Sequence, residues 1–200
     1  MSTSIEFFFD FSSPYAYFAS FRVDDLARAV GREVVWKPIM IGAAFKESGN
    51  QPLIGQPLKG DYVRRDWARQ AERMQVPWVL PDPFPIAALA PSRVFYWFDD
   101  RDPEQAKIFA HAAFRTYFGE GKDISKPEAL TGAIEAAGGV AVDVFAAIQE
   151  PAVKERLKKE TTAAIERGVC GSPFFIVDGE PFWGSDRLWM VKKWIRGDNW

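Results

Sequence analysis

The stretch Phe7–Tyr17 constrains the fold of this chain more than any other part of the sequence. Residues Ile5–Asp10 form an apolar run rich in phenylalanine, which predicts a strand buried on both faces. Small polar residues follow, and then Pro14, whose missing N–H suits the first turn of a helix. A strand that leads directly into a helix leaves free backbone N–H groups at the turn, where Ser13 lies. Such a helix start would stabilise a thiolate held beside it.

The first forty residues are predicted to form a β-α-β unit. Residues Pro14–Val30 carry apolar side chains at helical spacing, and Gly31 ends the pattern as a C-cap. Glu33–Pro38 has the alternation of a second strand, and its proline keeps Lys37 extended. The two strands are expected to be parallel and joined by a right-handed crossover.

The middle of the chain is predicted to be helical. Residues 42–59 hold several Gly, Pro and polar residues, which predict a short helix and then a long loop. From residue 61 to residue 168 every pattern is helical, and three helices have a proline in their first turn. The Pro77–Pro85 segment, with four prolines, is an extended connection. The expected helices are Asp61–Gln75, Ala87–Asp99, Pro103–Phe118, Pro127–Ala137, Val142–Gln149 and Pro151–Arg167.

Strand patterns return only near the C-terminus. Phe174–Val177 and Glu180–Trp183 flank Asp178-Gly179, a hairpin turn that prefers positive φ at its centre. A last helix is expected from about Ser185 to Ile195. The predicted order is therefore β-α-β, a helical insert, and β-β-α.

The Ser13-Pro14-Tyr15-Ala16 motif occupies the place of the Cys-Pro-x-Cys pair of DsbA-type disulfide oxidoreductases, with both cysteines replaced. The chain resembles the 2-hydroxychromene-2-carboxylate isomerase family and its relatives, the kappa-class glutathione transferases. The resemblance implies an α/β, thioredoxin-like fold with an α-helical domain inserted between its β-α-β and β-β-α halves. Residues 1–42 and 169–200 would form the thioredoxin-like domain, and residues 43–168 the insertion. Redox chemistry of the protein's own thiols needs two sulfurs, so the fold is expected to hold another molecule's thiolate.

A second motif, Gly171-Ser172-Pro173, matches the loop that in thioredoxin-like proteins holds a cis-proline facing the active-site turn. A cis bond would turn the N–H and C=O of Ser172 sideways, where they can pair with a bound cysteinyl peptide. On its own, Pro173 is better explained as the plain start of a strand. The presence of both motifs, at opposite ends of the chain, favours a site.

Further residues match positions that bind glutathione, the cofactor that the resemblance implies. By residue type, Ser185 and Asp186 are N-caps of the last helix, but the resemblance implies that they bind the γ-glutamyl end. By residue type, Asn50 is a turn former, whereas the resemblance implies that it contacts the ligand. The resemblance also implies that Lys59 binds the glycyl carboxylate. Ser13 would then donate a hydrogen bond to the glutathione thiolate and would not itself be a nucleophile.

The resemblance implies a glutathione-dependent cis-trans isomerase that interconverts 2-hydroxychromene-2-carboxylate and trans-o-hydroxybenzylidenepyruvate in the catabolism of naphthalene-type aromatics. One alternative is a kappa-class-like glutathione transferase or peroxidase that acts on another electrophile. A second alternative is a non-catalytic thiol- or peptide-binding module. A serine hydrolase is disfavoured because the one histidine, His111, lies in the predicted helical insert. The insert is rich in aromatic residues, for example Trp67, Trp78, Phe84 and Trp97, which by default belong to the core. Some of these aromatic residues are nevertheless expected to cover a small, flat aromatic substrate.

Composition and charge exclude several other functions. A net charge of −2 gives no general attraction to nucleic acid or to an anionic membrane. No window has the ~18 apolar residues of a membrane span, and the N-terminus does not read as a signal peptide. The single cysteine, Cys170, fits a reducing compartment and is expected to be a small buried residue. We therefore expect a cytoplasmic protein with no metal site, and the resemblance implies a homodimer.

Overall fold

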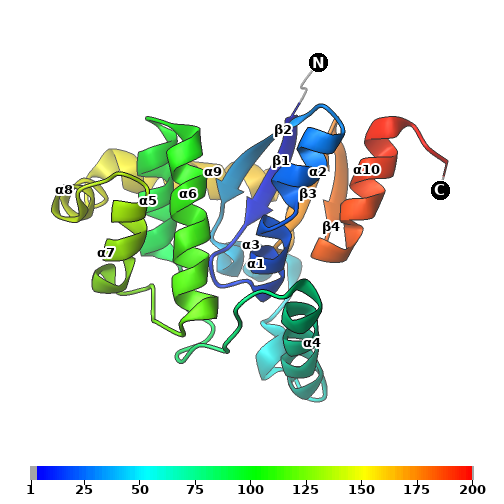
Figure 1. The fold of residues 1–200 in the computed structure, drawn as a ribbon, viewed down its shortest axis with the longest axis horizontal. Helices are drawn as coiled ribbons and strands as arrows, with labels where there is room; N and C mark the ends of the chain where they lie inside the picture. Colours follow the sequence, from blue (N-terminus) through cyan, green and yellow to red (C-terminus); the bar gives the residue numbers. More distant parts are fainter. Residues whose placement is uncertain (1–3, 200) are drawn as a thin grey trace.

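The computed structural model describes residues 4–199, whose strands form a single four-stranded sheet (Figure 1). The strands lie in the order β2-β1-β3-β4. β1 is parallel to β2 and antiparallel to β3, and β3 is antiparallel to β4. Their bounds are Ser4–Phe9 for β1, Glu33–Pro38 for β2, Phe174–Val177 for β3 and Glu180–Trp183 for β4. The predicted α/β class and the predicted order of the strands are confirmed.

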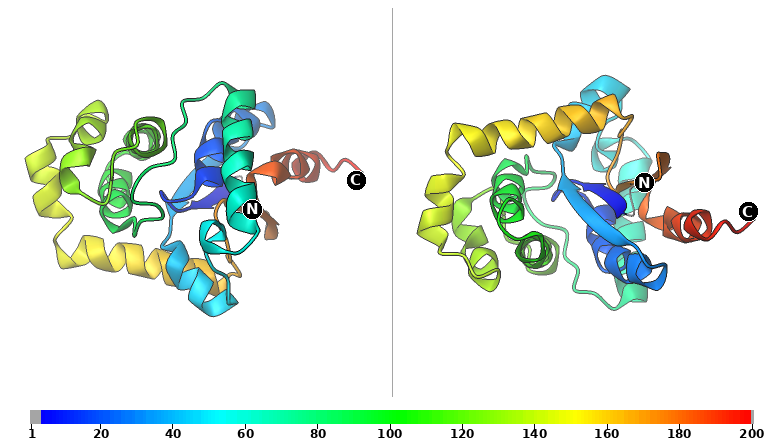
Figure 2. Two further views of the ribbon diagram at one scale, coloured as in Figure 1. Left: turned by 90° about the horizontal axis from the view of Figure 1, so that it is seen from below. Right: turned by 90° about the horizontal axis from the view of Figure 1, so that it is seen from above.

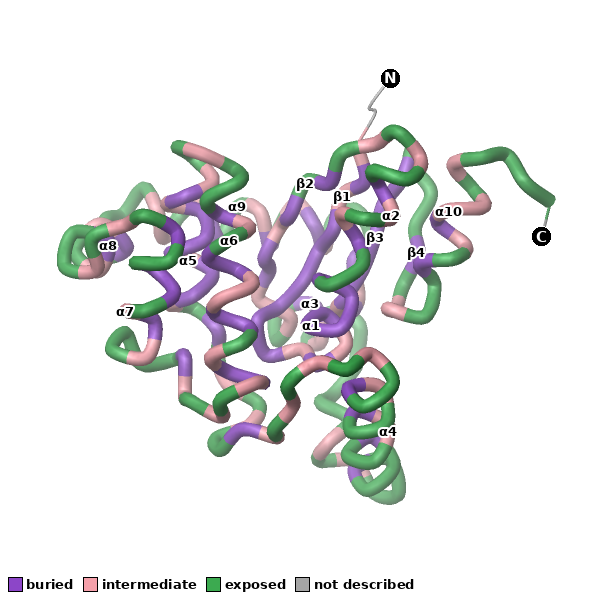
Figure 3. The backbone as a smooth tube through the Cα atoms, viewed as in Figure 1, coloured by how far each residue is buried: buried purple, intermediate pink, exposed green. Residues whose placement is uncertain are grey.

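β1 lies inside the sheet and is covered on both faces, which explains its run of three phenylalanines. The rings of Phe7 and Phe9 stack with centroids 5.1 Å apart, and both meet the indole of Trp36 edge-on. Phe8 points to the other face, where it packs with Phe174 in a smaller cluster. Accordingly, most of β1 is drawn in purple, the colour of buried residues, in Figure 3.

Helices surround this sheet and extend beyond it (Figures 1 and 2). A group formed by α5, α6, α7 and α8 lies at one end of the molecule, and α10 lies near the other. The long helix α9 runs from that group back to the sheet, where it packs against β2. The helices are α1 (Pro14–Ser20), α2 (Val23–Ala29), α3 (Ile41–Ser48), α4 (Lys59–Met74), α5 (Leu89–Asp99), α6 (Pro103–Phe114), α7 (Pro127–Ala136), α8 (Ala141–Ala147), α9 (Pro151–Glu166) and α10 (Leu188–Arg196).

The prediction of one helix over Pro14–Val30 is wrong, because the structure has two, α1 and α2. The hydroxyl of Ser20 donates to the carbonyl of Tyr17 at 2.7 Å. The N–H of Arg22 donates to the carbonyl of Ala19, three residues earlier. In an α-helix the acceptor would be four residues earlier, so the chain is wound more tightly here. A hydroxyl that bonds back to the helix competes with the regular ladder and bends it, so the chain turns between the two helices.

Among the helix starts that differ from prediction, two concern candidate site residues. Lys59 is the first residue of α4 and not part of the loop before it, which contains a short 3-10 turn at Leu53–Gly55. The last helix does not begin at Ser185. Residues Ser185–Arg187 form a separate 3-10 turn, η3, and α10 begins at Leu188. At the end of α6, the predicted helix continues as a π-helical turn over Arg115–Gly119.

The division of the chain into two domains stays a prediction. The predicted boundary after residue 42 falls within α3. The hydrophobic core also continues from the sheet into the helical insert. The ring of Phe9 lies 5.7 Å from the rings of both Phe95 in α5 and Phe114 in α6.

Within residues 4–199, no single helix is long and apolar enough to cross a membrane. Only α7 and α8 taken together reach the required length and composition, and the chain bends by 118° between them. Their side chains Leu130, Ile134 and Val144 are buried in the hydrophobic core.

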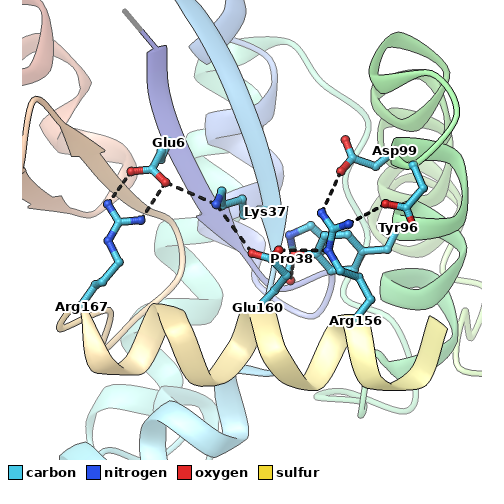
Figure 4. Close-up of polar contacts among 9 residues, drawn as sticks. Glu6, Lys37, Pro38, Tyr96, Asp99, Arg156, Glu160 and Arg167 are labelled. Atoms are coloured by element: carbon cyan, nitrogen blue, oxygen red, sulfur yellow. Dashed lines mark hydrogen bonds and ion pairs between the residues drawn. The ribbon is translucent and has the colours of Figure 1, made fainter. Parts of the chain in front are cut away.

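A chain of ion pairs joins α9 to both strands of the β-α-β unit and to α5 (Figure 4). The guanidinium of Arg167 donates two hydrogen bonds to the carboxylate of Glu6. The Lys37 ammonium lies 3.4 Å from Glu6 and 3.6 Å from Glu160. Arg156 links Glu160 to two aspartates at the end of α5.

We expect Glu6→Gln to lower the free energy of unfolding by about 1 kcal/mol near neutral pH. The hydrogen bond from Arg167, with the charges of Arg167 and Lys37, holds the pKa of Glu6 below its ordinary 4.5, against the opposing effect of burial. A lowered folded-state pKa gives stability that is present above the unfolded-state pKa and is lost as the pH falls through the folded-state value. Urea unfolding should therefore show that the free energies of unfolding of the variant and the unsubstituted protein differ less in acid than at neutral pH. A difference that grows in acid would contradict the assignment.

Candidate active site

One cavity, of about 1370 Å³, contains every residue that the sequence analysis predicts for the site. Its walls come from the turn after β1, the loop before β3, η3 and the segment between α3 and α4. The predicted residues that line it are Ser13, Asn50, Lys59, Ser172, Pro173, Ser185 and Asp186. The fold thus brings the two ends of the chain and part of its middle to one place.

Ser13 links the two ends of the chain. It is the N-cap of α1, and its Oγ accepts a hydrogen bond from the N–H of Ala16 at 3.2 Å. The same hydroxyl donates to the backbone carbonyl of Ser172 at 2.8 Å. The Oγ of Ser172 in turn accepts from the N–H of Asp10 at 2.8 Å. The peptide bond between Ser172 and Pro173 is cis, as predicted.

Asp10 is a buried carboxyl group at the edge of the same cavity, and the sequence analysis did not single it out. Only 2% of its surface is exposed. One carboxylate oxygen accepts from the N–H of Ser12 at 2.7 Å, and the other accepts from the N–H of Ile41 at 2.9 Å. Burial raises the pKa of Asp10 to about 6, although the two backbone hydrogen bonds oppose the shift. This carboxyl group therefore ties the Ser13 turn to the start of α3.

The helix α4 contributes a row of polar side chains. The sequence analysis did not single out Asp66, whose Oδ2 accepts from the hydroxyl of Tyr15 at 2.9 Å. Lys59 donates to the Oε1 of Gln56 at 2.9 Å. Asp66 follows Lys59 by seven residues, about two turns of α4, so both lie on one face of the helix. The α4 residues at helical spacing that line the cavity are Lys59, Tyr62, Asp66 and Gln70.

Ser185 and Asp186 lie in η3 and do not cap α10. The residue before α10 is Arg187, and neither η3 nor α10 has a side-chain cap. Gly184 has φ of +115°, and a Cβ atom there would lie 2.5 Å from the Oδ1 of Asp186. The glycine therefore allows the carboxylate of Asp186 to fold back at the cavity wall.

The remaining predicted contacts lie nearby. The side-chain amide of Asn50 is 3.5 Å from the carbonyl oxygen of Cys170, just before the cis-proline loop. Cys170 itself is partly buried and packs against the smaller core cluster. His111 lies outside this cavity, with its ring 5.1 Å from that of Trp36.

Aromatic side chains form much of the apolar lining. Trp67 and Phe84 line the cavity, as expected of some aromatic residues in the insert, with their rings 5.5 Å apart. Trp78 and Trp97, which were named with them, lie outside this lining. Trp78 instead stacks on the ring of Phe118 at 5.4 Å. Tyr15, Phe45, Tyr62 and Trp183 complete the aromatic lining.

We expect Gly171→Ala to lower the free energy of unfolding by about 1–3 kcal/mol. A Cβ atom on Gly171 would lie 2.1 Å from the Nε1 of Trp183, so the indole would have to leave the cavity wall. Gly132→Ala is the matched control, because Gly132 lies in α7 with nothing within 4 Å of its Cβ position. That change should stabilise the protein by up to about 1 kcal/mol. Urea unfolding measures both, and equal stabilities of the two variants would contradict the prediction.

Known proteins resemble this chain over nearly its whole length. The family model described as the DSBA-like thioredoxin domain matches residues 4–196. The chain is 31% identical to a 2-hydroxychromene-2-carboxylate isomerase of Sphingobium xenophagum, over 98% of this chain and 99% of that protein. It is 26% identical to glutathione S-transferase kappa 1 of Homo sapiens, over 98% of this chain and 92% of that protein. A solved 2-hydroxychromene-2-carboxylate isomerase structure has a TM-score of 0.86 at 27% identity, covering 97% of this chain and 95% of that one.

Proposed function

Since the chain belongs to the DSBA-like thioredoxin domain family and to the family of the 2-hydroxychromene-2-carboxylate isomerases, we propose that it is a glutathione-dependent isomerase. It would interconvert 2-hydroxychromene-2-carboxylate and trans-o-hydroxybenzylidenepyruvate in aromatic catabolism. The isomerase relatives support the reaction, and the relative named glutathione S-transferase kappa supports the cofactor. The observation that carries the proposal is the position of Ser13, whose hydroxyl meets the Ser172-Pro173 loop in a cavity with charged side chains.

Glutathione fits this cavity in charge and in length. Lys59 suits the glycyl carboxylate, and Asp66 with Asp186 suits the glutamyl ammonium. Lys59 and Asp66 are seven residues apart on α4, which is about 10 Å along the helix axis. Three residues of extended peptide span about the same distance. The cavity volume of about 1370 Å³ leaves room for a second molecule beside the tripeptide.

Ser172 would hold the cysteinyl part of the cofactor through its backbone. Its carbonyl accepts the hydroxyl of Ser13 in the structure. We propose that the ligand's peptide N–H takes over this carbonyl, so that the Ser13 hydroxyl turns toward the sulfur. The N–H of Ala16 can continue to donate to the Ser13 oxygen, which makes the hydroxyl a better donor. Asn50 and Pro173 would enclose the same part of the ligand.

The task of Ser13 is to keep the sulfur ionised. A free thiol with a pKa of about 8.5 is only a few per cent ionised at neutral pH. Lowering that pKa by about 2 units takes about 2.7 kcal/mol. A hydrogen bond to a charged group contributes about 1.5–3 kcal/mol, so the Ser13 hydroxyl can supply much of this amount.

Bound glutathione would supply a thiolate that adds reversibly to the conjugated double bond of the substrate, which lets that bond rotate. The chain's own part is to hold the substrate and exclude water. Tyr15, Trp67 and Phe84 give a flat ring an apolar wall close to Ser13.

The proposal is tested by measuring isomerisation with dialysed protein, with and without added glutathione. We expect turnover only when glutathione is present, and glutathione should be recovered unchanged. Calorimetry should show that glutathione binds without the aromatic substrate. Equal turnover without glutathione would overturn the proposal.

The second candidate is a kappa-class-like transferase or peroxidase, favoured by the 26% identity to the human protein of that name. It would consume glutathione in proportion to product, as a thioether or as a disulfide. The third is a non-catalytic thiol- or peptide-binding module. Absence of glutathione binding at high micromolar concentration would favour that module.

We further propose a cytoplasmic homodimer that acts on small aromatic molecules and has no nucleic-acid or membrane partner. The net charge of −2 supports the absence of nucleic-acid and membrane partners, and the single cysteine supports a reducing compartment. The dimer rests on the family resemblance alone. Gel filtration with light scattering tests the dimer.

A further inference from the structure

Asp10 is the one buried carboxyl group among the described residues that line the cavity. Of the other two aspartates there, Asp66 is partly buried and Asp186 is exposed. Within residues 4–199, no lysine, arginine or histidine pairs with the Asp10 carboxylate, which accepts hydrogen bonds from two backbone N–H groups. Burying an anion without a cation is unfavourable. The site therefore favours the protonated carboxyl group more than water does.

The carboxyl group of Asp10 belongs to the same turn as Ser13. The N–H of Ser13 donates to the backbone carbonyl of Asp10 at 2.9 Å. Both residues also bind Ser172: the N–H of Asp10 donates to its Oγ, and the hydroxyl of Ser13 donates to its carbonyl, each at 2.8 Å. A sulfur held at Ser13 would therefore lie at the same end of the cavity as the Asp10 carboxyl group.

Ionisation of the glutathione thiol requires a group that accepts its proton. The hydroxyl of Ser13 donates a hydrogen bond to the thiolate and cannot take the proton as well. Lys59 and the tyrosines of the cavity are already protonated at neutral pH. Asp66 and Asp186 are assigned to the glutamyl ammonium. A base works best when its pKa is near the working pH, and burial raises the pKa of Asp10 to about 6.

We propose that Asp10 takes up the proton that the glutathione thiol loses on binding, an inference that rests on the proposed function. The S–H bond breaks, its electron pair stays on the sulfur, and the proton ends on a carboxylate oxygen of Asp10. The cavity then holds one anion at this end in place of two. Since like charges repel, the thiolate raises the pKa of Asp10 further. Around neutral pH the pair therefore keeps one proton, which lies on the carboxyl group.

The other groups packed around Asp10 do not titrate near neutral pH. From the end of α6, the hydroxyl of Tyr117 donates to the carbonyl of Pro83 at 2.9 Å, and burial raises the pKa of Tyr117. The loop before β3 presents the hydroxyl of Ser172, and α3 presents the backbone N–H of Ile41. A change in proton count between about pH 6 and pH 8 would therefore come from Asp10 and the sulfur.

The test combines two measurements of glutathione binding at about pH 7. Ultraviolet absorbance shows whether the bound sulfur is a thiolate, and calorimetry in buffers of different ionisation enthalpy counts the protons released. The unsubstituted protein should form the thiolate and release almost no proton, because Asp10 keeps it. The variant D10N should also form the thiolate but release about one proton to the buffer.

The affinity for glutathione should follow the same proton count. For D10N it should rise about tenfold from pH 6.5 to pH 7.5, because one proton is released for each ligand bound. For the unsubstituted protein it should change less than about twofold. The matched control is D198N, because Asp198 is exposed and lies outside the cavity. This variant should behave like the unsubstituted protein in every measurement.

Two outcomes would overturn the inference while the proposed function stands. One is release of about one proton by the unsubstituted protein as the thiolate forms, a result that needs no variant and so does not depend on the folding of D10N. The other is a folded D10N that forms the thiolate without releasing a proton, because another group must then hold it. If the unsubstituted protein did not bind glutathione at all, the proposed function itself would fail.

Discussion

Replacing Ser13 by alanine is expected to slow glutathione-dependent isomerisation about 10- to 100-fold. The lost hydroxyl removes a hydrogen bond to an anion, worth about 1.5–3 kcal/mol, and each 1.4 kcal/mol corresponds to a tenfold change in rate. For the same reason the pKa of the bound glutathione thiol should rise by about 1–2 units. Ultraviolet absorbance of the thiolate, followed as the pH is changed, measures this shift directly.

The variant Ser13→Thr is the control, because it keeps a hydroxyl group at the same position. It should retain the lowered thiol pKa and most of the activity. Alanine also removes the N-cap of α1, which costs about 1 kcal/mol of stability, so urea unfolding must show that the variant is folded. An unchanged thiol titration in folded S13A would refute the assigned role.

Asp10 is expected to make the protein less stable as the pH rises from about 4 to about 7. Burial raises the pKa of this carboxyl group to about 6, from an ordinary value of 3.8. Between these values the folded state binds more protons than the unfolded state, so the free energy of unfolding falls with rising pH. A difference of about two units corresponds to about 3 kcal/mol. This trend is opposite in sign to that of Glu6.

The variant Asp10→Asn should lose this part of the pH dependence. In the structure, both carboxylate oxygens accept a hydrogen bond from a backbone N–H group. The NH₂ group of asparagine cannot accept one, so it would face one of these N–H groups without bonding to it. In acid, the variant should therefore be less stable than the unsubstituted protein. Urea unfolding of both proteins between about pH 4 and pH 7 isolates the contribution of Asp10 from those of other groups. The same pH slope in both proteins would contradict the prediction.

The sequence predicts the parts of the fold whose signals are local. Pro14 follows a polar turn directly after an apolar run, and Pro173 directly precedes another such run. Asp178-Gly179 predicts the hairpin, and both residues have positive φ in the structure. Strand order and the meeting of Ser13 with Ser172 then follow from the resemblance to a known fold.

Other parts depend on tertiary contacts that no local pattern contains. The break between α1 and α2 arises where Ser20 bonds back to Tyr17, and helical spacing continues across it. Asp66 lies within the predicted helix Asp61–Gln75 but was missed, because its hydrogen bond with Tyr15 joins two elements that are far apart in the sequence.

The hydrogen bond between Ser13 and Ser172 joins residues that are 159 positions apart. During synthesis, a nascent chain that has not yet reached residue 172 can already form helices of the insert, but β1 has no β3 to pair with. Closing so long a segment is a late and slow event in folding. The cavity beside Ser13 can therefore be completed only after translation has passed the final strands.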